Sequence, residues 1–565
     1  MGVAVRVAAM GELAVLVTPP QPEQVLMLYA GFLQTPIDGQ VDVVPGAESV
    51  LIVFDGRERI RSACGMVRVR ALEALARPFD LDTVVSAAIV RIDAVYDGTD
   101  LDEVACLTGL SREAVIAAHT SMDWQVSFIG FAPGFGYLSG GDKRLRVPRR
   151  SSPRTEVPSG AIGLAGEYSG IYPRASPGGW QLIGHSDTPL WGIHRDPPAL
   201  LRPGMRVRFR ATRAKAVTTH ETRGGASRTA TRTLSGESAS VGTVTVIRPG
   251  TLCLVQDLGR AGRASLGVSP SGAADHGAAR SANHLVGNSP GAAELEILLG
   301  GAVFRIDADA TIAVTGAEVP VTINTGADRD SEGRISADQF SADRGSADRH
   351  GGKRTVPNNI AVRVPAGSTI RLGRPTHGLR SYLAVRGGID VTPVLGSRSA
   401  DLLAGLGLAP LRADDVLLIG RSYEADLPAV ELSAIEGPTG SEIHASAIRF
   451  GPVELAILSG PQQDCLTPAA LAELTSAEWT VSPKSNRVGI RLDGPRLVEN
   501  VIPEIPSQPV VRGAIQLTPS GELVAFLADY PVTGGYPVIA VLTEASADLT
   551  AQLRPGSTAR FHRVL

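Results

Sequence analysis

One stretch, residues 128–191, limits most strongly what this chain can fold into. It reads FIGFAPGFGYLSGGDKRLRVPRRSSPRTEVPSGAIGLAGEYSGIYPRASPGGWQLIGHSDTPLW and is dense in glycine and proline. Glycine adopts backbone angles that other residues avoid and proline fixes φ, so the short apolar runs between them indicate strands joined by shaped loops. Arg149, Arg150 and Arg154 lie close together here. Such arginines suit the recognition of a carboxylate or phosphate through paired hydrogen bonds; ordinary surface arginines beside turns are the alternative.

The composition points to many turns and several domains. The chain has 565 residues, including 63 glycines and 39 prolines. At about 150 residues per domain, this length predicts roughly three to four domains. Barrels and sandwiches need a turn every 8–12 residues or so, and we therefore predict a mainly β protein. The formal net charge of −3 gives no case for binding nucleic acid or an acidic membrane.

Signals for export, membrane insertion and cysteine chemistry are weak. Arg6 and Glu12 interrupt the apolar part of the N-terminus, so no signal peptide is predicted. No apolar run reaches the ~18 residues that a membrane helix needs. The four cysteines are far apart and form no CxxC pair, which favours neither a disulfide framework nor a zinc site. We expect a cytoplasmic protein.

The hydrophobic pattern divides the chain into segments. A β-α-β-β-α order in residues 1–85 predicts a small α+β domain of the ferredoxin-like type. Residues 86–210 are predicted to form a β-barrel with two short helices, and the polar composition of 211–240 is typical of a disordered linker. Two further β-barrels are predicted at 241–420, with a polar insertion at 326–355, and at 421–565.

Three pieces of sequence recur in the same order. SGAIGLAG near residue 160 resembles RGAIQLTPSG near 513, SPGGWQLIG near 179 resembles TGGYPVIAV near 535, and LLRPGMRVRF resembles QLRPGSTARF at the C-terminus. Ordered recurrence at similar spacing indicates duplicated β-barrel domains.

Several common catalytic motifs are absent from the sequence. It contains no GxxxxGK[ST] phosphate loop, no dinucleotide fingerprint, no HExxH and no GxSxG nucleophile elbow. If the chain uses ATP, its binding site must therefore be of an unusual kind.

Isolated polar residues offer further candidates. Alternation places Glu294 and Glu296 on one face of a strand, where two carboxylates could bind Mg²⁺ or act as base and acid; solvated strand residues are the alternative. His185 could act as a general base or could cap a strand end. For Arg386 and Arg398, in the glycine turns of 378–402, anion recognition and plain turn geometry are both open.

Long motifs resemble two related families. FIGFAPGFGYL, PRRSSPRTEVPSG and SPGGWQLIG resemble the allophanate hydrolase subunit 1 family, which includes the B subunit of bacterial 5-oxoprolinase and Kip-type kinase inhibitors. VQDLGRAGRASLGVSPSGAAD, ANHLVGNSPGAAELE, YLAVRGGIDVTPVLGSRSADL and WTVSPKSNRVGIRLDG resemble the subunit 2 family, which includes the C subunit. The chain thus resembles a natural B–C fusion joined through the predicted linker.

The resemblance implies cyclophilin-like β-barrels and an activity. It implies a role in the ATP-dependent opening of 5-oxoproline to glutamate, with ATP and Mg²⁺, in an oligomeric assembly with a separate A subunit of the lactam-utilisation type. A Kip-type regulator that inhibits a sensor histidine kinase is one alternative. Accessory domains of a urea carboxylase or allophanate hydrolase system are another.

Residue type and these motifs together predict the site residues. In the first half, substrate or nucleotide binding is assigned to Gly134, Tyr137, Arg149, Arg150, Arg154, Ser159, Gly178, Gly179, Trp180 and Gln181. In the second half it is assigned to Arg260, Asp275, Asn283, Arg386, Arg398, Gly534, Gly535 and Tyr536, with His185, Glu294 and Glu296 as catalytic candidates. The chain departs from the family pattern at Gly136, where relatives usually have proline, and at His185, where they often have arginine.

Overall fold

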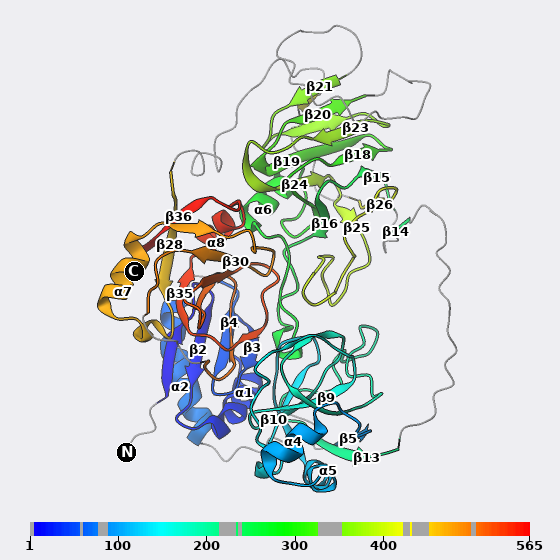
Figure 1. The fold of residues 1–565 in the computed structure, drawn as a ribbon. Coiled ribbons are helices and arrows are strands. Elements are labelled where there is room, and N and C mark those ends of the chain that lie inside the picture. Colours follow the sequence, from blue (N-terminus) through cyan, green and yellow to red (C-terminus); the bar gives the residue numbers. More distant parts are fainter. Residues whose placement is uncertain are drawn as a thin grey trace.

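The computed structural model describes most of the chain (Figure 1). The described residues are 5–56, 60–76, 89–213, 233–234, 240–325, 353–421, 430–431, 451–498 and 504–564. Nearly all of the predicted linker (211–240) and of the predicted insertion (326–355) lies outside these ranges. None of the helices in the described ranges is long and apolar enough to cross a membrane.

The N-terminal part is an antiparallel sheet with two helices on one face. The sheet has the order β1-β2-β4-β3, and its bounds are β1 (Arg6–Ala9), β2 (Ala14–Thr18), β3 (Gln40–Pro45) and β4 (Val50–Phe54), with helices α1 (Val25–Gln34) and α2 (Ile60–Ala76). Phe32 of α1 and Val67 of α2 share a buried cluster with Val15 and Ile52. The order is β-β-α-β-β-α, one strand more than the sequence pattern indicated, because AVLVT forms β2.

A seven-stranded sheet follows and curls into a nearly closed barrel. Its order is β12-β9-β10-β7-β6-β13-β5, and a bridge between Val95 and His185 joins the last strand to the first. The bounds are β5 (Ile89–Ala94), α4 (Leu101–Thr108), α5 (Arg112–Ser121), β6 (Trp124–Ile129), β7 (Gly136–Ser139), β8 (Arg154–Val157), β9 (Ala161–Ala165), β10 (Tyr168–Ile171), β11 (Ser176–Gly178), β12 (Gln181–His185) and β13 (Arg206–Ala211). We call this body the first barrel.

The second barrel consists of two facing sheets around one apolar core that includes Phe304 and Leu383. Helix α6 packs on the outside of strands β19 and β24. The bounds are β14 (Thr233–Leu234), β15 (Gly242–Arg248), β16 (Leu252–Gln256), α6 (His276–Leu285), β17 (Glu294–Leu298), β18 (Val303–Ile306), β19 (Ala310–Glu318), β20 (Val321–Asn324), β21 (Lys353–Val356), β22 (Ala361–Val364), β23 (Thr369–Leu372), β24 (His377–Val385), β25 (Ile389–Asp390), β26 (Val416–Ile419) and β27 (Val430–Glu431).

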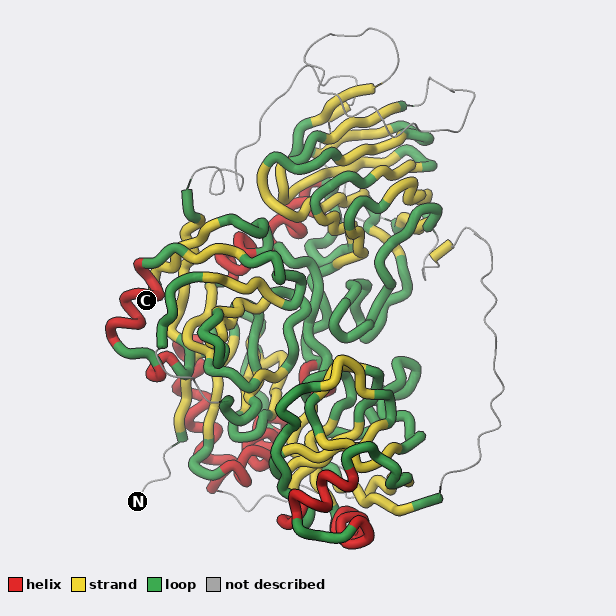
Figure 2. The backbone as a smooth tube through the Cα atoms, viewed as in Figure 1, coloured by secondary structure: helices red, strands yellow, loops and turns green. Residues whose placement is uncertain are grey.

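The third barrel is closed, in the order β28-β35-β32-β33-β30-β29-β36. Its bounds are β28 (Val453–Ser459), α7 (Pro468–Ser476), β29 (Trp479–Val481), β30 (Gly489–Asp493), β31 (Gln508–Pro509), β32 (Ala514–Leu517), β33 (Leu523–Phe526), β34 (Thr533–Gly534), β35 (Val538–Leu542), α8 (Glu544–Thr550) and β36 (Thr558–Arg563). Figure 2 shows strands in every lobe, with short helices beside them. The prediction of a mainly β chain with an α+β N-terminal part and tandem barrels is confirmed.

The two ends of the chain share a core. The face of the N-terminal sheet that the helices leave free packs on the third barrel, so Leu16, Val44 and Leu51 form one buried cluster with Phe526 and Val541. Figure 1 shows this sheet in blue directly beside the orange and red barrel. We call this contact the seam. It joins the two segments that the sequence predicts to be fused.

Candidate functional site

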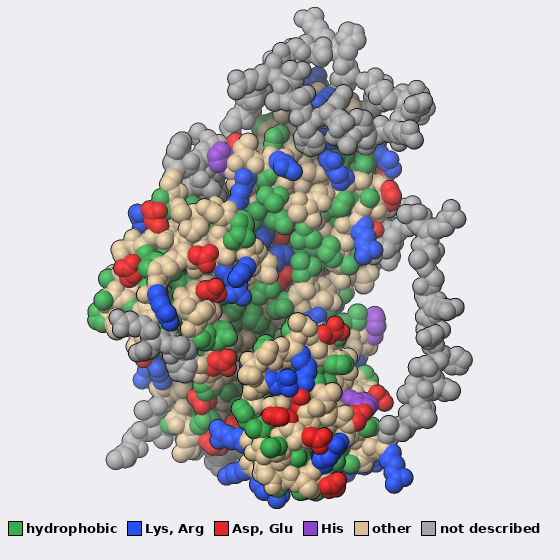
Figure 3. All heavy atoms as spheres, in the orientation of Figure 1, with side chains coloured by type: hydrophobic (Ala, Val, Ile, Leu, Met, Phe, Trp, Pro, Cys, Tyr) green, Lys and Arg blue, Asp and Glu red, His purple; other side chains and the backbone are tan. Residues whose placement is uncertain are grey.

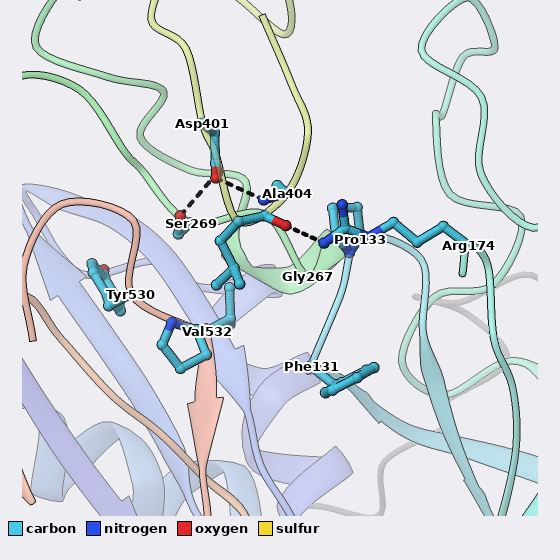
Figure 4. A pocket seen from close by; sticks show the side chains of 11 residues that line it. Phe131, Pro133, Arg174, Gly267, Ser269, Asp401, Ala404, Tyr530 and Val532 are labelled. Atoms are coloured by element: carbon cyan, nitrogen blue, oxygen red, sulfur yellow. Dashed lines mark hydrogen bonds between the residues drawn. The ribbon is translucent and has the colours of Figure 1, made fainter. Parts of the chain in front are cut away.

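A cleft lies where the first barrel meets both later barrels. In Figure 3 the surface is hollowed where the first barrel meets the rest of the molecule. The cleft is partly open to solvent. Five segments line it (Figure 4), with Phe131 and Pro133 after β6, Arg174 before β11, Gly267 and Ser269 after a short 3₁₀ turn, Asp401 to Ala404, and Tyr530 to Val532 before β34.

Strained backbone shapes one wall of the cleft. Phe131 has φ of 64°, in the left-handed region that a bulky side chain rarely adopts, and its side chain is 38% exposed. Such strain persists where the surroundings impose it, and it is common at functional sites. The N–H of Gly134 donates to the carbonyl of Leu266 (3.0 Å). A Cβ at Gly267 would lie 2.6 Å from the carbonyl oxygen of Ala132, so these two loops meet where only glycine fits.

Polar groups face each other across the cleft. The Arg174 guanidinium donates to the carbonyl of Leu403. The Ser269 hydroxyl donates to Asp401 Oδ2 (3.2 Å), and the Ala404 N–H donates to Asp401 Oδ1 (2.7 Å). Burial raises the pKa of the Asp401 carboxyl and the nearby Asp529 adds to this effect, while burial lowers the pKa of Arg174.

Two of the three predicted arginines converge on one carboxylate. Arg150 and Arg154 donate to Asp100 Oδ1 at 2.9 and 2.7 Å, and Asp100 Oδ2 accepts from the backbone N–H of Leu182 (2.7 Å). The sequence pattern predicts that Asp100 caps a helix, but its side chain makes no capping hydrogen bond. Arg149 is 51% exposed and lies 3.9 Å from Glu504, so it is the member of the cluster that an anion in solution can reach.

The predicted aromatic and glycine residues build the wall behind these arginines. Tyr137 stacks on Phe128 with ring centroids 4.2 Å apart, and Trp180 contacts Tyr137 edge-on. A Cβ at Gly178 would lie 2.3 Å from the Tyr172 hydroxyl. Among the remaining predicted residues, the Gly179 carbonyl accepts from Arg150, the Ser159 hydroxyl donates to the Pro173 carbonyl, and Gln181 is buried.

His185 lies at the end of β12, at the rim of the first barrel. Its Nδ1 is 2.8 Å from Asp97 Oδ1, and its side chain is 41% exposed. Its backbone exchanges hydrogen bonds with Val95. The histidine therefore has a carboxylate that can orient the ring, and its role as a general base stays a prediction.

Glu294 and Glu296 share one face of β17 and are both buried. Glu296 accepts from the Arg487 guanidinium, from the Tyr382 hydroxyl (2.9 Å) and from the Ala274 N–H (2.8 Å). Burial opposes ionisation of Glu296, but the charges of Arg487 and Arg380 lower its pKa.

Neither carboxyl oxygen of Glu294 has a partner within the described residues. Burial, aided by Glu296 and Asp275, raises the pKa of Glu294 well above its usual value. The surroundings of the two carboxyl groups therefore shift their pKa values in opposite directions.

Replacing Glu294 by glutamine is expected to flatten the pH dependence of stability. At pH values between the pKa of Glu294 in the unfolded chain and its raised pKa in the folded chain, only the unfolded chain is ionised at this residue. The wild type therefore loses stability as the pH rises through this range. Within this range the free energy of unfolding of the wild type falls by about 1.4 kcal/mol for each pH unit. In urea unfolding, E294Q should match the wild type at about pH 4 and exceed it at about pH 8. The control is the same change at exposed Glu454; equal pH profiles for E294Q and the wild type would contradict a protonated Glu294.

The other predicted residues of the second half fasten loops and helix ends. Arg260 donates to the carbonyls of Val394 and Ser399, Asp275 caps α6 at the Ala278 N–H, Asn283 donates to the Ala292 carbonyl, Arg386 donates to the Val286 carbonyl, and Arg398 donates to Asp390. Gly534 pairs with Gln508, the Gly535 carbonyl accepts from Ile505, and the Tyr536 carbonyl accepts from Gln516. Their binding roles stay predictions. Within the described residues, no three His, Cys, Asp or Glu side chains gather closely enough to hold a metal ion.

No local sequence signal marks the polar residues of the cleft. Asp401 stands within one of the family motifs, whereas Arg174 lies between two of them, and the two residues are 227 positions apart in the sequence. Tyr530 and Phe131 come from still other loops. Only the packing of the barrels brings these residues together.

Both halves of the chain are similar to known proteins. The family described as "Carboxyltransferase domain, subdomain C and D" matches residues 5–201, and "Carboxyltransferase domain, subdomain A and B" matches residues 266–563. The B subunit of 5-oxoprolinase from Escherichia coli O157:H7 is 38% identical over 174 residues, which are 30% of this chain and 77% of that protein. The C subunit of 5-oxoprolinase from Escherichia coli K12 is 33% identical over 319 residues, which are 56% of this chain and 89% of that protein.

A solved structure extends the similarity over the whole length. The crystal structure of TTHA0988 has a TM-score of 0.76 and 32% identity, and the match covers 99% of this chain and 100% of that one. The arrangement of a B-like segment followed by a C-like segment thus lies within a single fold. The chain belongs to the carboxyltransferase-domain family and joins, in one polypeptide, relatives of the B and C subunits of 5-oxoprolinase.

Proposed function

We propose that the chain is the fused B–C component of an ATP-dependent 5-oxoprolinase, which opens the lactam 5-oxoproline to glutamate together with a separate A subunit. One observation carries the proposal. The cleft is lined by Phe131 and Arg174 from the B-like segment and by Ser269, Asp401 and Tyr530 from the C-like segment. Because the cleft needs residues of both segments, joining them in one polypeptide keeps the two sides of the site together.

The chemistry explains the need for ATP. An amide carbonyl is a poor electrophile, and phosphorylation of its oxygen makes the carbon easier to attack. Arg149 is the exposed arginine of its cluster and suits an anionic phosphate or carboxylate group. The Glu294–Glu296 pair fits a Mg²⁺ site less well, because Glu296 is already bound by Arg487 and burial raises the pKa of Glu294 well above its usual value. We therefore assign no metal to that pair.

The proposal predicts genetic complementation. A host that lacks its own B and C subunits should grow on 5-oxoproline as the nitrogen source when it receives this chain together with an A subunit of the lactam-utilisation type. Neither protein alone should support growth. The absence of growth despite soluble expression of both would contradict the proposal, and inhibition of a sensor histidine kinase by the purified chain would then favour the regulatory alternative.

A further inference from the structure

We propose that the cleft binds a small molecule carrying both a carboxylate and an amide carbonyl, with Arg174 as the carboxylate anchor and the Asp401 carboxyl group as the hydrogen-bond donor to the carbonyl. The assignment deepens the proposed function and rests on it for the identity of the ligand, 5-oxoproline. It concerns two residues that are not among the site residues predicted from the sequence.

Arg174 has the properties of an anion anchor. It reaches from the first barrel toward the 401–404 loop and donates one hydrogen bond to the Leu403 carbonyl. Its Nε is buried and has no partner within the described residues. Gly405 leaves room for the guanidinium, since a Cβ there would lie 3.2 Å from Arg174 Nη1. In the described parts of the chain Arg174 donates its hydrogen bond to a neutral carbonyl, and Asp401 acts on it through its charge. A bound carboxylate would give the guanidinium a counter-charge with a direct hydrogen bond.

Asp401 lies close enough to a second carboxylate, Asp529, to be affected by its charge. Asp529 is fully buried and receives two hydrogen bonds from Arg487, both of 3.0 Å. It also accepts from the N–H of Leu402, the residue next to Asp401 (3.1 Å). Two neighbouring buried carboxylates do not both ionise readily, and the one that lacks a bidentate arginine keeps its proton.

The surroundings of Asp401 fit a neutral carboxyl group that donates. Burial first and Asp529 second raise the pKa of Asp401, against the opposing effects of the Ala404 N–H, Arg260 and Ser269. The charge of Arg174, on the other side of the cleft, opposes the neutral form, because a nearby guanidinium favours an ionised carboxylate. A protonated Asp401 has an O–H that can donate to a carbonyl oxygen, as a neutral buried carboxylic acid does in other enzymes.

Apolar side chains line the same cleft. Phe131 is held by edge-on contacts with Phe135 and Tyr172, at centroid distances of 5.3 and 6.0 Å. Pro133 and Val532 line the cleft beside it (Figure 4). A shallow apolar wall with a few convergent polar groups is typical of small-molecule sites.

Direct binding to the purified full-length chain tests the assignment without ATP or a partner. Three probes separate the two contacts: 5-oxoproline, 2-pyrrolidone, which lacks the carboxylate, and proline, which lacks the amide carbonyl. Calorimetry should show that the wild type prefers 5-oxoproline to both other probes. R174Q should weaken 5-oxoproline binding by about 10- to 100-fold and remove the preference over 2-pyrrolidone. The control is R144Q, since Arg144 is exposed on a distant loop and pairs with Asp142.

The Asp401 contact has its own readout. D401N keeps a donor and should retain binding within about threefold, whereas D401L should lose about 10-fold or more. Binding to the wild type should weaken as pH rises and Asp401 ionises, and binding to D401N should not. Thermal unfolding of each variant shows whether it is folded.

The outcomes separate this inference from the proposed function. Equal 5-oxoproline binding by R174Q and the wild type would overturn the inference, and so would the absence of 5-oxoproline binding by the wild type. ATP-dependent turnover with the A subunit is measured independently and decides the proposed function. Turnover that persists in R174Q with an unchanged KM would leave the proposed function standing and place the substrate elsewhere.

Discussion

Replacing Arg487 by alanine is expected to lower the free energy of unfolding by about 3–5 kcal/mol. The side chain is 4% exposed and bridges Glu296 of the second barrel and Asp529 of the third. It also donates to the Gly272 carbonyl (2.6 Å). Its removal takes the paired arginine away from the buried Asp529 and leaves Glu296 with Arg380, 3.7 Å away. Leaving a buried carboxylate without its partner costs more than the net gain from forming the pair.

Urea unfolding of R487A and R491A measures this effect against a matched control. Arg491 pairs with Glu522 at 3.0 Å, but the two side chains are 42% and 35% exposed. An exposed pair contributes less than about 1 kcal/mol. Similar losses in the two variants would show that the Arg487 network does not hold the barrels together.

Placing a charge in the seam is the second change with a large expected effect. Leu51→Asp should lower the free energy of unfolding by about 4–5 kcal/mol, near the upper end for single substitutions. Leu51 is 2% exposed and lies in the cluster that joins the N-terminal sheet to the third barrel. A carboxylate there has no partner and must be desolvated or protonated.

A matched leucine outside the seam provides the control. Leu72 of α2 is 42% exposed, and Leu72→Asp should cost less than about 1 kcal/mol. The same pair also tests function, since the loss of 5-oxoproline-dependent turnover should accompany Leu51→Asp alone. If L51D and L72D are equally stable, the two ends of the chain do not share a core.

Local sequence patterns predicted the architecture well, because each strand, helix and turn depends mainly on the residues within its own segment. Period-two alternation and glycine–proline turns marked most strands, and the helical pattern from Pro22 to Leu33 corresponds closely to α1. The missed strand, β2, is a short apolar run, AVLVT, that has no alternation to mark it, because four of its five residues are buried. Buried strands lose the polar face on which the pattern depends.

The site was less predictable because its contacts are distant in sequence. The arginines at 149–154 were found together because they are neighbours, but their partner Asp100 lies about fifty positions away. Glu294 and Glu296 were placed on one face by alternation. The lowered pKa of Glu296 depends on Arg487, which comes from another barrel. The cleft needs five segments, and no pattern within one of them predicts the others.

The most direct test of the proposed function is the conversion of 5-oxoproline to glutamate by purified proteins. The chain, its A subunit and ATP are combined with 5-oxoproline, and glutamate and ADP are measured against mixtures that lack each component in turn. We expect glutamate and ADP to form in equal amounts only in the complete mixture, and R174Q to reduce the rate while R144Q does not. Glutamate formation by the A subunit without this chain, or none in the complete mixture, would show that the chain is not the B–C component of a 5-oxoprolinase.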